Sequence, residues 1–284
     1  SILRSKLQPE RLAMSELLQC VQFLLWYDEI IRDLLEEDEQ ATLKCCITLD
    51  EIIDRCMDAY DNLNKEKIVG WITNILRNEE KSQPEKNEDN YYITTGPQDL
   101  FSNINQLFDF QSKDLSGKAL ARIAIMYGHV LLYFQECQKQ FFTHIRIEND
   151  EVKQSMNASY KSSTYVIAQI NNAAQYEQNT DDLRNHALDL LDDAPDYIKE
   201  EVETVYDDCV DGFFDVATHG VSVIIKYIID TIVPMMNKFF TSSWLNDTNS
   251  TDAILEVISD MCSDYLGHHG MERDAFKKHL LCEI

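Results

Sequence analysis

The chain has 284 residues, of which 44% are hydrophobic, and its 50 acidic against 25 basic side chains give a formal net charge of −25. Only eight glycines and five prolines are present, which disfavours sandwiches, barrels and Rossmann-type folds because their many turns need these residues. The acidic surface disfavours nucleic-acid binding and electrostatic docking on anionic membranes, since both depend on Lys and Arg. The charge either keeps the surface soluble or selects basic partner surfaces.

The first third of the chain predicts two amphipathic helices. The first begins near Pro9 and carries apolar residues at helical spacing as far as Leu35. Residues Thr48-Leu49-Asp50-Glu51 form a capping box, which predicts the start of the second helix. An apolar stripe continues through residues 68–76, whereas residues 77–90 contain no apolar side chain and are expected to form a mobile loop. A short helix should then begin at Thr95-Gly96-Pro97.

The longest helical pattern covers residues 116–145, where apolar side chains alternate three and four apart. A polar break over residues 146–159 predicts a hinge, and another helix covers about 162–191 until Pro195. His219-Gly220 is expected to bend the following helix, and Pro234 should kink or end it. The β-branched run 221–232 would also fit a strand, although no partner strand is evident. Further helical patterns cover residues 251–265 and 271–284.

These patterns predict an all-α fold, an elongated rod of stacked antiparallel helical bundles. We expect residues 1–148 to form an N-terminal helical sub-bundle and residues 149–284 to form a C-terminal one. The chain begins on Ser1 and stops at Ile284 within an amphipathic pattern. We therefore interpret the sequence as a fragment whose C-terminal sub-bundle is truncated at its end.

A search for catalytic motifs gives no Gly-rich phosphate loop, no H-E-x-x-H and no nucleophile elbow. Asp208 and Asp211 lie one helical turn apart, as do Asp260 and Asp264, but chance spacing is expected in a chain with so many acidic residues. The sequence therefore predicts that the protein is not an enzyme, with no catalytic residues and no cofactor.

The most metal-like feature is His268-His269, which lies near Cys262 and Asp264. Adjacent side chains on a helix diverge by about 100°, so a helix end closed by Gly270 explains the pair better than a metal site does. We expect no bound metal. Eight scattered cysteines without a C-x-x-C pair indicate free thiols in a reducing compartment. The apolar run 221–233 is too short to span a bilayer.

Pairs of adjacent aromatic residues stand out, and most are expected to belong to the core. Tyr91-Tyr92 is the exception, because it adjoins the predicted mobile loop. We therefore predict Tyr91 and Tyr92 as a partner-binding site. The pairs expected in the core include Trp26-Tyr27, Phe141-Phe142, Phe213-Phe214 and Phe239-Phe240.

Several segments form an ordered set across most of the chain. A Trp-bearing helix is followed by a charged loop, a Tyr-Tyr-x-Thr element, a Pro-initiated helix, a Tyr-x-x-Ala-x-Ile-Asn-Asn helix and a Trp-Leu element. The segments are Lys67–Leu76, Asn90–Phe101, Tyr165–Asn172, Phe239–Leu245 with Trp244, and Thr251–Tyr265. In this order they resemble the C-terminal half of the Sec-six family of exocyst subunits. The acidic, Asn-rich composition suggests a fungal member.

The resemblance implies a helical rod that serves as a vesicle-tethering scaffold and helps to dock secretory vesicles at the plasma membrane before SNARE-mediated fusion. Implied partners are other exocyst subunits, plasma-membrane SNAREs and Sec-one/Munc-family SNARE regulators, without nucleic acid and without direct membrane insertion. The oligomeric state is open, with a homodimer among the alternatives. The implied location is cytoplasmic, peripherally at sites of secretion, which in a budding fungus are the bud tip and bud neck. Another α-helical adaptor or a GTPase-effector module is the alternative function.

Overall fold

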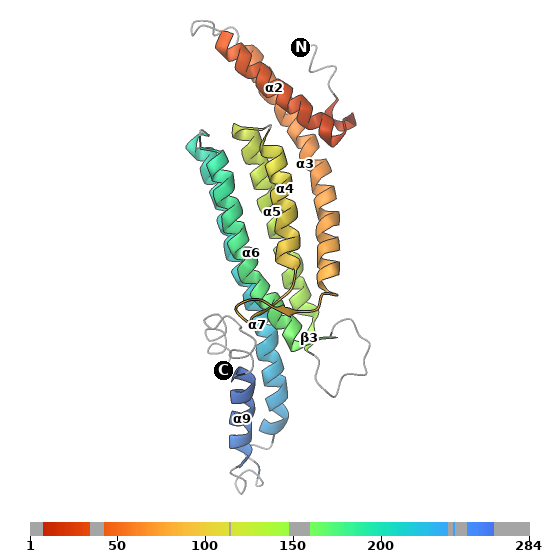
Figure 1. Cartoon of the computed structure of the whole chain (residues 1–284), viewed down its shortest axis with the longest axis vertical. Helices are drawn as coiled ribbons and strands as arrows, with labels where there is room; N and C mark the ends of the chain where they lie inside the picture. Colours follow the sequence, from red (N-terminus) through yellow and green to blue (C-terminus); the bar gives the residue numbers. More distant parts are fainter. Residues whose placement is uncertain are drawn as a thin grey trace.

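The fold is a rod of long helices, and the computed structural model describes residues 8–34, 43–113, 115–147, 160–192, 194–237, 241 and 249–263 (Figure 1). Two pairs of two-residue strands accompany the helices. In chain order the elements are η1 (Pro9–Arg11), α2 (Met14–Leu34), α3 (Leu43–Glu79), β1 (Glu85–Lys86), β2 (Tyr92–Ile93), α4 (Gly96–Ser112), α5 (Gly117–His144), β3 (Arg146–Ile147), β4 (Tyr160–Lys161), α6 (Ser163–Leu190), α7 (Asp196–Met236) and α9 (Asn249–Ser263).

The helices are stacked along one long axis (Figure 1). Helices α3 to α7 lie side by side in the middle, α2 crosses the upper end of α3, and α7 continues past the others to pack against α9. The strands β1 and β2 form an antiparallel hairpin at the lower end of α3 and α4. The predicted all-α rod of antiparallel helical bundles is therefore confirmed.

The core forms because each long helix has one apolar stripe that needs a neighbour. At its centre, three aromatic rings come from three helices, Phe134 on α5, Tyr176 on α6 and Phe213 on α7. The ring of Tyr176 lies 5.1 Å from that of Phe134 and 5.2 Å from that of Phe213, between centroids. Such contacts add to the area that these rings bury.

Helix α7 is unbroken through Gly220, so the bend predicted at His219-Gly220 is wrong. A side chain at Gly220 would overlap Ile170 on α6 and Phe142 on α5. The glycine is therefore explained by the close approach of three helices, which outweighs its poor helix propensity. The strand alternative for residues 221–232 is also wrong, because they belong to α7. The prediction at Pro234 is confirmed, since α7 ends two residues later.

Two expectations for the first third are corrected. Helix α3 begins at Leu43, so Thr48 lies inside the helix and does not cap it. The same helix runs without a break to Glu79, and residues 85–86 pair with residues 92–93, so the segment 77–90 is not a continuous loop. Asn90 has φ = 67°, and its left-handed backbone turns the chain into β2.

The predicted division after residue 148 stays a prediction. Residues 148–159 lie outside the described part of the chain. Helix α5, before the division, packs on α7, which comes after it, and buried residues on both sides join one hydrophobic cluster.

Candidate interaction surfaces

A buried carboxyl group lies at the lower end of α3, within the segment that the sequence assigned to a loop. The Glu79 side chain is only 5% exposed. Its Oε1 atom accepts hydrogen bonds from Gln169 Nε2 at 2.7 Å, from Asn172 Nδ2 at 3.2 Å and from the hydroxyl of Thr94. The Tyr165 hydroxyl donates to the backbone carbonyl of Glu79 at 3.1 Å. We call these residues, with Glu79 at the centre, the Glu79 cluster.

Burial raises the pKa of Glu79, because the low-polarity surroundings disfavour its charged form. The hydrogen bonds from Gln169 and Asn172 oppose this shift, whereas the negative charge of Asp99 adds to it. A Cβ at Gly96 would overlap the Glu79 carboxyl group and the Tyr176 hydroxyl, so only glycine fits at this start of α4. The Glu79 cluster therefore joins α3 and α6 to the segment between β2 and α4.

Residues next to the Glu79 cluster position the two tyrosines predicted to bind a partner. Asn171 Nδ2 donates to the carbonyl of Tyr92 at 2.9 Å, and Lys86 Nζ lies 5.1 Å from the centre of the Tyr92 ring. The Tyr91 backbone N–H donates to Asn87 Oδ1 at 2.8 Å, and its side chain is 45% exposed. The hairpin thus presents Tyr91 to solvent and holds Tyr92 half-buried. Their role in partner binding stays a prediction.

Exposed aromatic residues on α2 correct the expectation for Trp26-Tyr27. Both rings are exposed rather than buried, and Phe23 lies 5.9 Å from Trp26 and 6.1 Å from Tyr27, between ring centroids. The buried stripe of α2 uses different positions, so this pair lies on another face of the helix. Elsewhere the core expectation is confirmed for Phe142 and Phe213, Phe141 packs at the edge of the core, Phe214 is exposed, and Phe239-Phe240 lie outside the described residues.

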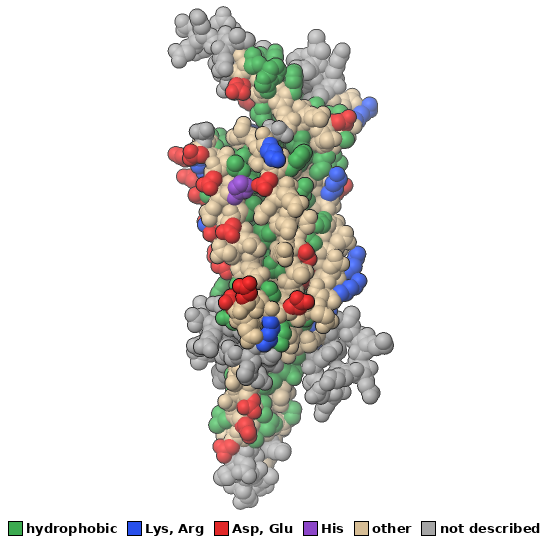
Figure 2. All heavy atoms as spheres, viewed as in Figure 1, with side chains coloured by type: hydrophobic (Ala, Val, Ile, Leu, Met, Phe, Trp, Pro, Cys, Tyr) green, Lys and Arg blue, Asp and Glu red, His purple; other side chains and the backbone are tan. Residues whose placement is uncertain are grey.

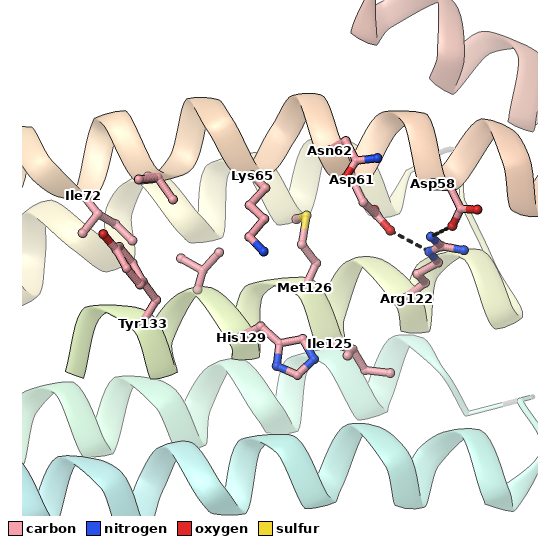
Figure 3. Close-up of a pocket in the computed structure, with 12 residues that line it drawn as sticks. Asp58, Asp61, Asn62, Lys65, Ile72, Arg122, Ile125, Met126, His129 and Tyr133 are labelled. Atoms are coloured by element: carbon pink, nitrogen blue, oxygen red, sulfur yellow. Dashed lines mark hydrogen bonds and ion pairs between the residues drawn. The ribbon is translucent and has the colours of Figure 1, made fainter. Parts of the chain in front are cut away.

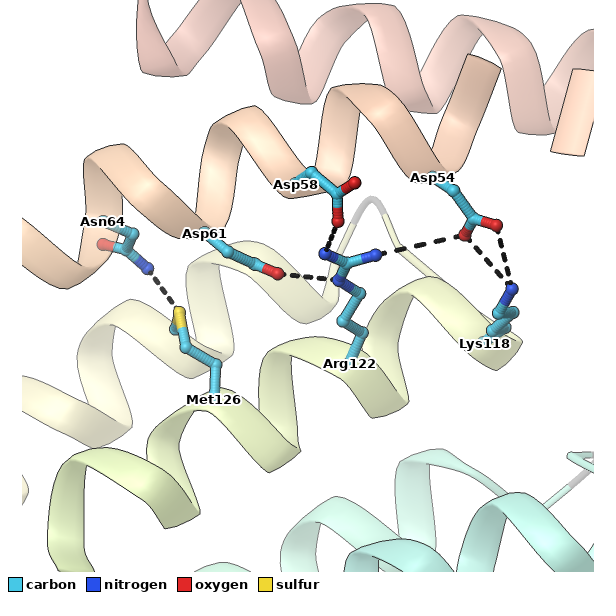
Figure 4. Close-up of polar contacts among 7 residues, drawn as sticks. All are labelled: Asp54, Asp58, Asp61, Asn64, Lys118, Arg122 and Met126. Atoms are coloured by element: carbon cyan, nitrogen blue, oxygen red, sulfur yellow. Dashed lines mark hydrogen bonds and ion pairs between the residues drawn. The ribbon is translucent and has the colours of Figure 1, made fainter. Parts of the chain in front are cut away.

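A groove of about 900 Å³ runs between α3 and α5 (Figure 3). At one end Arg122 bridges the helices, bonding Asp61 Oδ2 at 2.7 Å and the carboxylate of Asp58 (Figure 4). Lys118 pairs with Asp54 at 3.1 Å one turn further on. Burial raises the pKa of Asp61, while its bond to Arg122 and that positive charge lower it. These ion pairs hold the two helices together at one end of the groove.

The rest of this groove is lined by apolar and polar side chains, among them Lys65. Lys65 extends from α3 into the gap between the helices, and His129 lies on α5 (Figure 3). Tyr133 is 44% exposed although it is a large aromatic residue. The remaining lining residues are Asn62, Val69, Ile72, Ile125, Met126 and Val130.

A second groove of about 770 Å³ lies where α2, α3 and α4 meet. Trp71, Leu107 and Phe110 line it, and Phe110 is 61% exposed. Exposed aromatic and aliphatic side chains at such a junction are typical of protein-binding surfaces. This end of the rod therefore offers a second candidate surface.

The described residues assemble no recognisable reaction chemistry. No group of three His, Cys, Asp or Glu side chains among them is placed to hold a metal ion. Asp208 and Asp211 are exposed on α7, and His268, His269 and Asp264 lie outside the described range. Cys20, Cys56, Cys137, Cys209 and Cys262 are free thiols. Burial raises the pKa of Cys56 to about 11 and that of Cys209 to about 12. High thiol pKa values disfavour the reactive thiolate.

The surface matches the acidic composition. In the view of Figure 2, Asp and Glu side chains are spread along the rod, while Lys and Arg occur singly. Helix α7 is long and apolar enough to cross a membrane by length and mean hydropathy (1.5), a test that core helices also pass. In this structure α7 packs on α5 and α6, and residues such as Val221 and Ile224 are fully buried there.

These features define an elongated helical scaffold whose candidate sites are surfaces for other proteins. The family model for exocyst complex component Sec6 matches residues 2–281, and the chain therefore belongs to the exocyst Sec6 family. The crystal structure of the C-terminal domain of the exocyst subunit Sec6p is similar, with a TM-score of 0.64 at 16% identity. The match covers 87% of this chain and 61% of that chain, and it supports the fold. A fungal origin stays a prediction.

The family segments noted in the sequence meet in space. Asn171 and Asn172, from the Ile-Asn-Asn helix, bond Tyr92 and Thr94, from the Tyr-Tyr-x-Thr element. Two segments about 80 residues apart in sequence thus form one buried joint. Sequence reasoning missed Glu79, which lies between them, because its neighbours are all polar.

Proposed function

We propose that this chain is a vesicle-tethering scaffold of the exocyst, which acts through protein–protein contacts and has no catalytic activity. Family membership over residues 2–281 is the observation that carries the proposal. An elongated rod supports it, because well-separated surfaces allow several modest contacts within one assembly to gain avidity. The exposed aromatic side chains on α2, α4 and the hairpin supply residue types that dominate binding energies at interfaces.

The proposed partners are the other exocyst subunits, plasma-membrane SNAREs and Sec-one/Munc-family SNARE regulators. The net charge of −25 supports partners with basic surfaces and argues against nucleic acid. The proposed location is cytoplasmic, peripherally at plasma-membrane sites of secretion, which are the bud tip and neck if the organism is a budding fungus. A homodimer is a further proposal that sedimentation measurements would test.

Affinity capture tests this function. The purified chain is immobilised and exposed at moderate salt to cytosolic extract from its source organism, and bound proteins are identified by mass spectrometry. We expect recovery of other exocyst subunits, with SNARE machinery in smaller amounts. A folded, helical bait that recovers none of them would contradict the proposal.

The hairpin tyrosines give the first specific prediction. Replacing Tyr91 by alanine should weaken capture of one exocyst partner by about tenfold, because an exposed aromatic residue at an interface contributes about 1–2 kcal/mol. The melting temperature should stay unchanged, since Tyr91 is 45% exposed. Tyr197, which is 67% exposed at the start of α7, supplies the matched control as Tyr197→Ala. Equal capture by both variants would remove Tyr91 from the binding site.

A further inference from the structure

The groove between α3 and α5 runs along one face of each helix. Its lining positions on α3 are residues 58, 61, 62, 65, 69 and 72, and those on α5 are 122, 125, 126, 129, 130 and 133. Neighbouring positions are one, three or four residues apart, as residues on one face of a helix are. The groove therefore has two continuous helical walls.

The two helices run in the same direction along the groove, since Arg122 meets Asp58 at one end while Ile72 and Tyr133 lie at the other (Figure 3). Side chains of a third helix can pack into the groove between two adjacent helices, as in a bundle. Residues 58 to 72 correspond to about 21 Å of helix at about 1.5 Å per residue. A partner helix of about 14 residues would fill that length.

Charge along the groove indicates which side chains such a helix would carry. The guanidinium of Arg122 is already bonded to Asp58 and Asp61, so it offers no free charge. Lys65 and His129 have no ion pair or hydrogen bond to any residue in the described part of the chain, and both are exposed. An unpaired lysine lining a groove is notable in a chain of net charge −25. A carboxylate between these two residues would pair with the Lys65 ammonium group and could accept a hydrogen bond from a ring N–H of His129.

Beyond Lys65 the groove becomes apolar. Val69 is half-buried and Tyr133 is 44% exposed, while Ile72 lies fully buried beneath them. Met126, on the opposite wall, accepts a hydrogen bond at its sulfur from Asn64 Nδ2 at 3.2 Å, and this contact fixes the flexible side chain. Apolar residues of a partner helix, one to two turns from its carboxylate, would bury against this part of the wall.

We propose that the groove between α3 and α5 binds one amphipathic helix of another protein, about four turns long, whose central Asp or Glu lies between Lys65 and His129. On the partner helix, apolar residues spaced three and four apart pack against Val69 and Tyr133. The inference rests on the proposed scaffold function, and it adds the location of one docking site and the chemistry of its occupant.

Photo-crosslinking in the assembled complex tests the inference. A benzophenone amino acid replaces Asn62, which lines the groove and is exposed, and in a control chain it replaces Glu66, which is exposed on α3 but does not line either groove. Each chain is mixed with the purified remaining exocyst subunits, irradiated and digested. We expect position 62 to crosslink to one segment with apolar residues three and four apart and an acidic residue among them.

The role of the Lys65 charge in binding the partner helix is tested in the same assay. Lys65→Glu should lower the crosslink yield from position 62 at least about tenfold, because like charges then face each other. Lys226→Glu makes the same charge change on an exposed position of α7 and should leave the yield unchanged. Reversing the acidic residue of the crosslinked segment to Lys should restore the yield with Lys65→Glu.

Results other than those expected above would overturn the inference. A complex that assembles without a crosslink from position 62, or with a yield that Lys65→Glu leaves unchanged, would overturn the inference and keep the proposed function. A crosslink to a second copy of the chain would show that the groove mediates self-association and does not bind a helix of another protein. Failure of the wild-type chain to join the complex at all would overturn both the proposed function and the inference.

Discussion

Replacing Glu79 by alanine is expected to lower the free energy of unfolding by about 3–5 kcal/mol. The variant leaves Gln169 Nε2 and the Thr94 hydroxyl as buried donors without their acceptor, and Asn172 Nδ2 keeps only its bond to Thr94 Oγ1. Each buried unsatisfied group costs about 1–3 kcal/mol. Chemical denaturation followed by far-UV circular dichroism measures the loss, and proteolysis should become faster near the β1–β2 hairpin, which this cluster anchors.

Glu80→Ala is the matched control, because Glu80 is the next residue along the chain and is exposed. Its backbone carbonyl accepts a hydrogen bond from Lys161 Nζ at 2.9 Å, and the substitution keeps that carbonyl. We expect Glu80→Ala to change the free energy of unfolding by less than about 0.5 kcal/mol. Similar losses for the two variants would show that Glu79 is not the centre of a buried joint.

The raised pKa of Glu79 also predicts a pH dependence that Glu79→Gln removes. The folded protein holds the proton more tightly than the unfolded chain does, so stability is greatest below the ordinary pKa of 4.5 and falls as pH rises through the folded-state pKa. Relative to Glu79→Gln, the wild-type protein should therefore lose stability as pH rises above 4.5, and the difference should then level off. A difference in stability that stays constant with pH would contradict a buried carboxyl group with a raised pKa.

Replacing Gly220 by valine is expected to lower the free energy of unfolding by about 3 kcal/mol. The new side chain would overlap Ile170 and Phe142, which come from two other helices and are themselves almost fully buried. Because both neighbours belong to the packed core, their side chains have little free space into which to rotate. Thermal and chemical unfolding measure the loss, and oligomeric state should be checked because loosened helices expose apolar surface.

Gly70→Val is the matched control on α3, since a Cβ at Gly70 would have no atom within 4 Å. Valine and glycine differ by only a few tenths of a kcal/mol in helix propensity, so the free energy of unfolding should change by less than about 0.5 kcal/mol. If Gly220→Val were tolerated as well as Gly70→Val, the three helices would not approach as closely as described.

The helices could be predicted from the sequence because each carries its own periodic pattern. The pattern of residues 116–145 gives α5 to within one residue at each end, and that of residues 162–191 gives α6 equally well. The residues that signal the start or end of a helix were less reliable as predictors. The capping box at Thr48 falls inside α3, because the apolar pattern around it continues and tertiary packing outweighs local capping preference. Gly220 resembled a bend because the sequence does not show which helices will cross there.

The candidate surfaces could be predicted only in part. Tyr91 was recognised because it adjoins a polar segment, and the structure exposes it. Glu79 could not be recognised, because its partner Gln169 lies 90 residues away and local composition indicates only a solvated segment. Trp26 was assigned to the core because aromatic residues are usually buried, yet only the packed structure shows which face of α2 meets α3. The α3–α5 groove likewise depends on two helices that are distant in sequence.

Helix α7 gives the rod a mechanical property that its outline alone does not show. Its 41 residues form one continuous helix, about 60 Å long at about 1.5 Å per residue. The first part is clamped by α5 and α6, and the last part carries α9 (Figure 1). A force or torque applied at α9 would therefore be transmitted through α7 alone to the bundle that α7 forms with α5 and α6. Partners bound at the two ends would be held at a nearly fixed distance, because the connection between them is rigid rather than flexible.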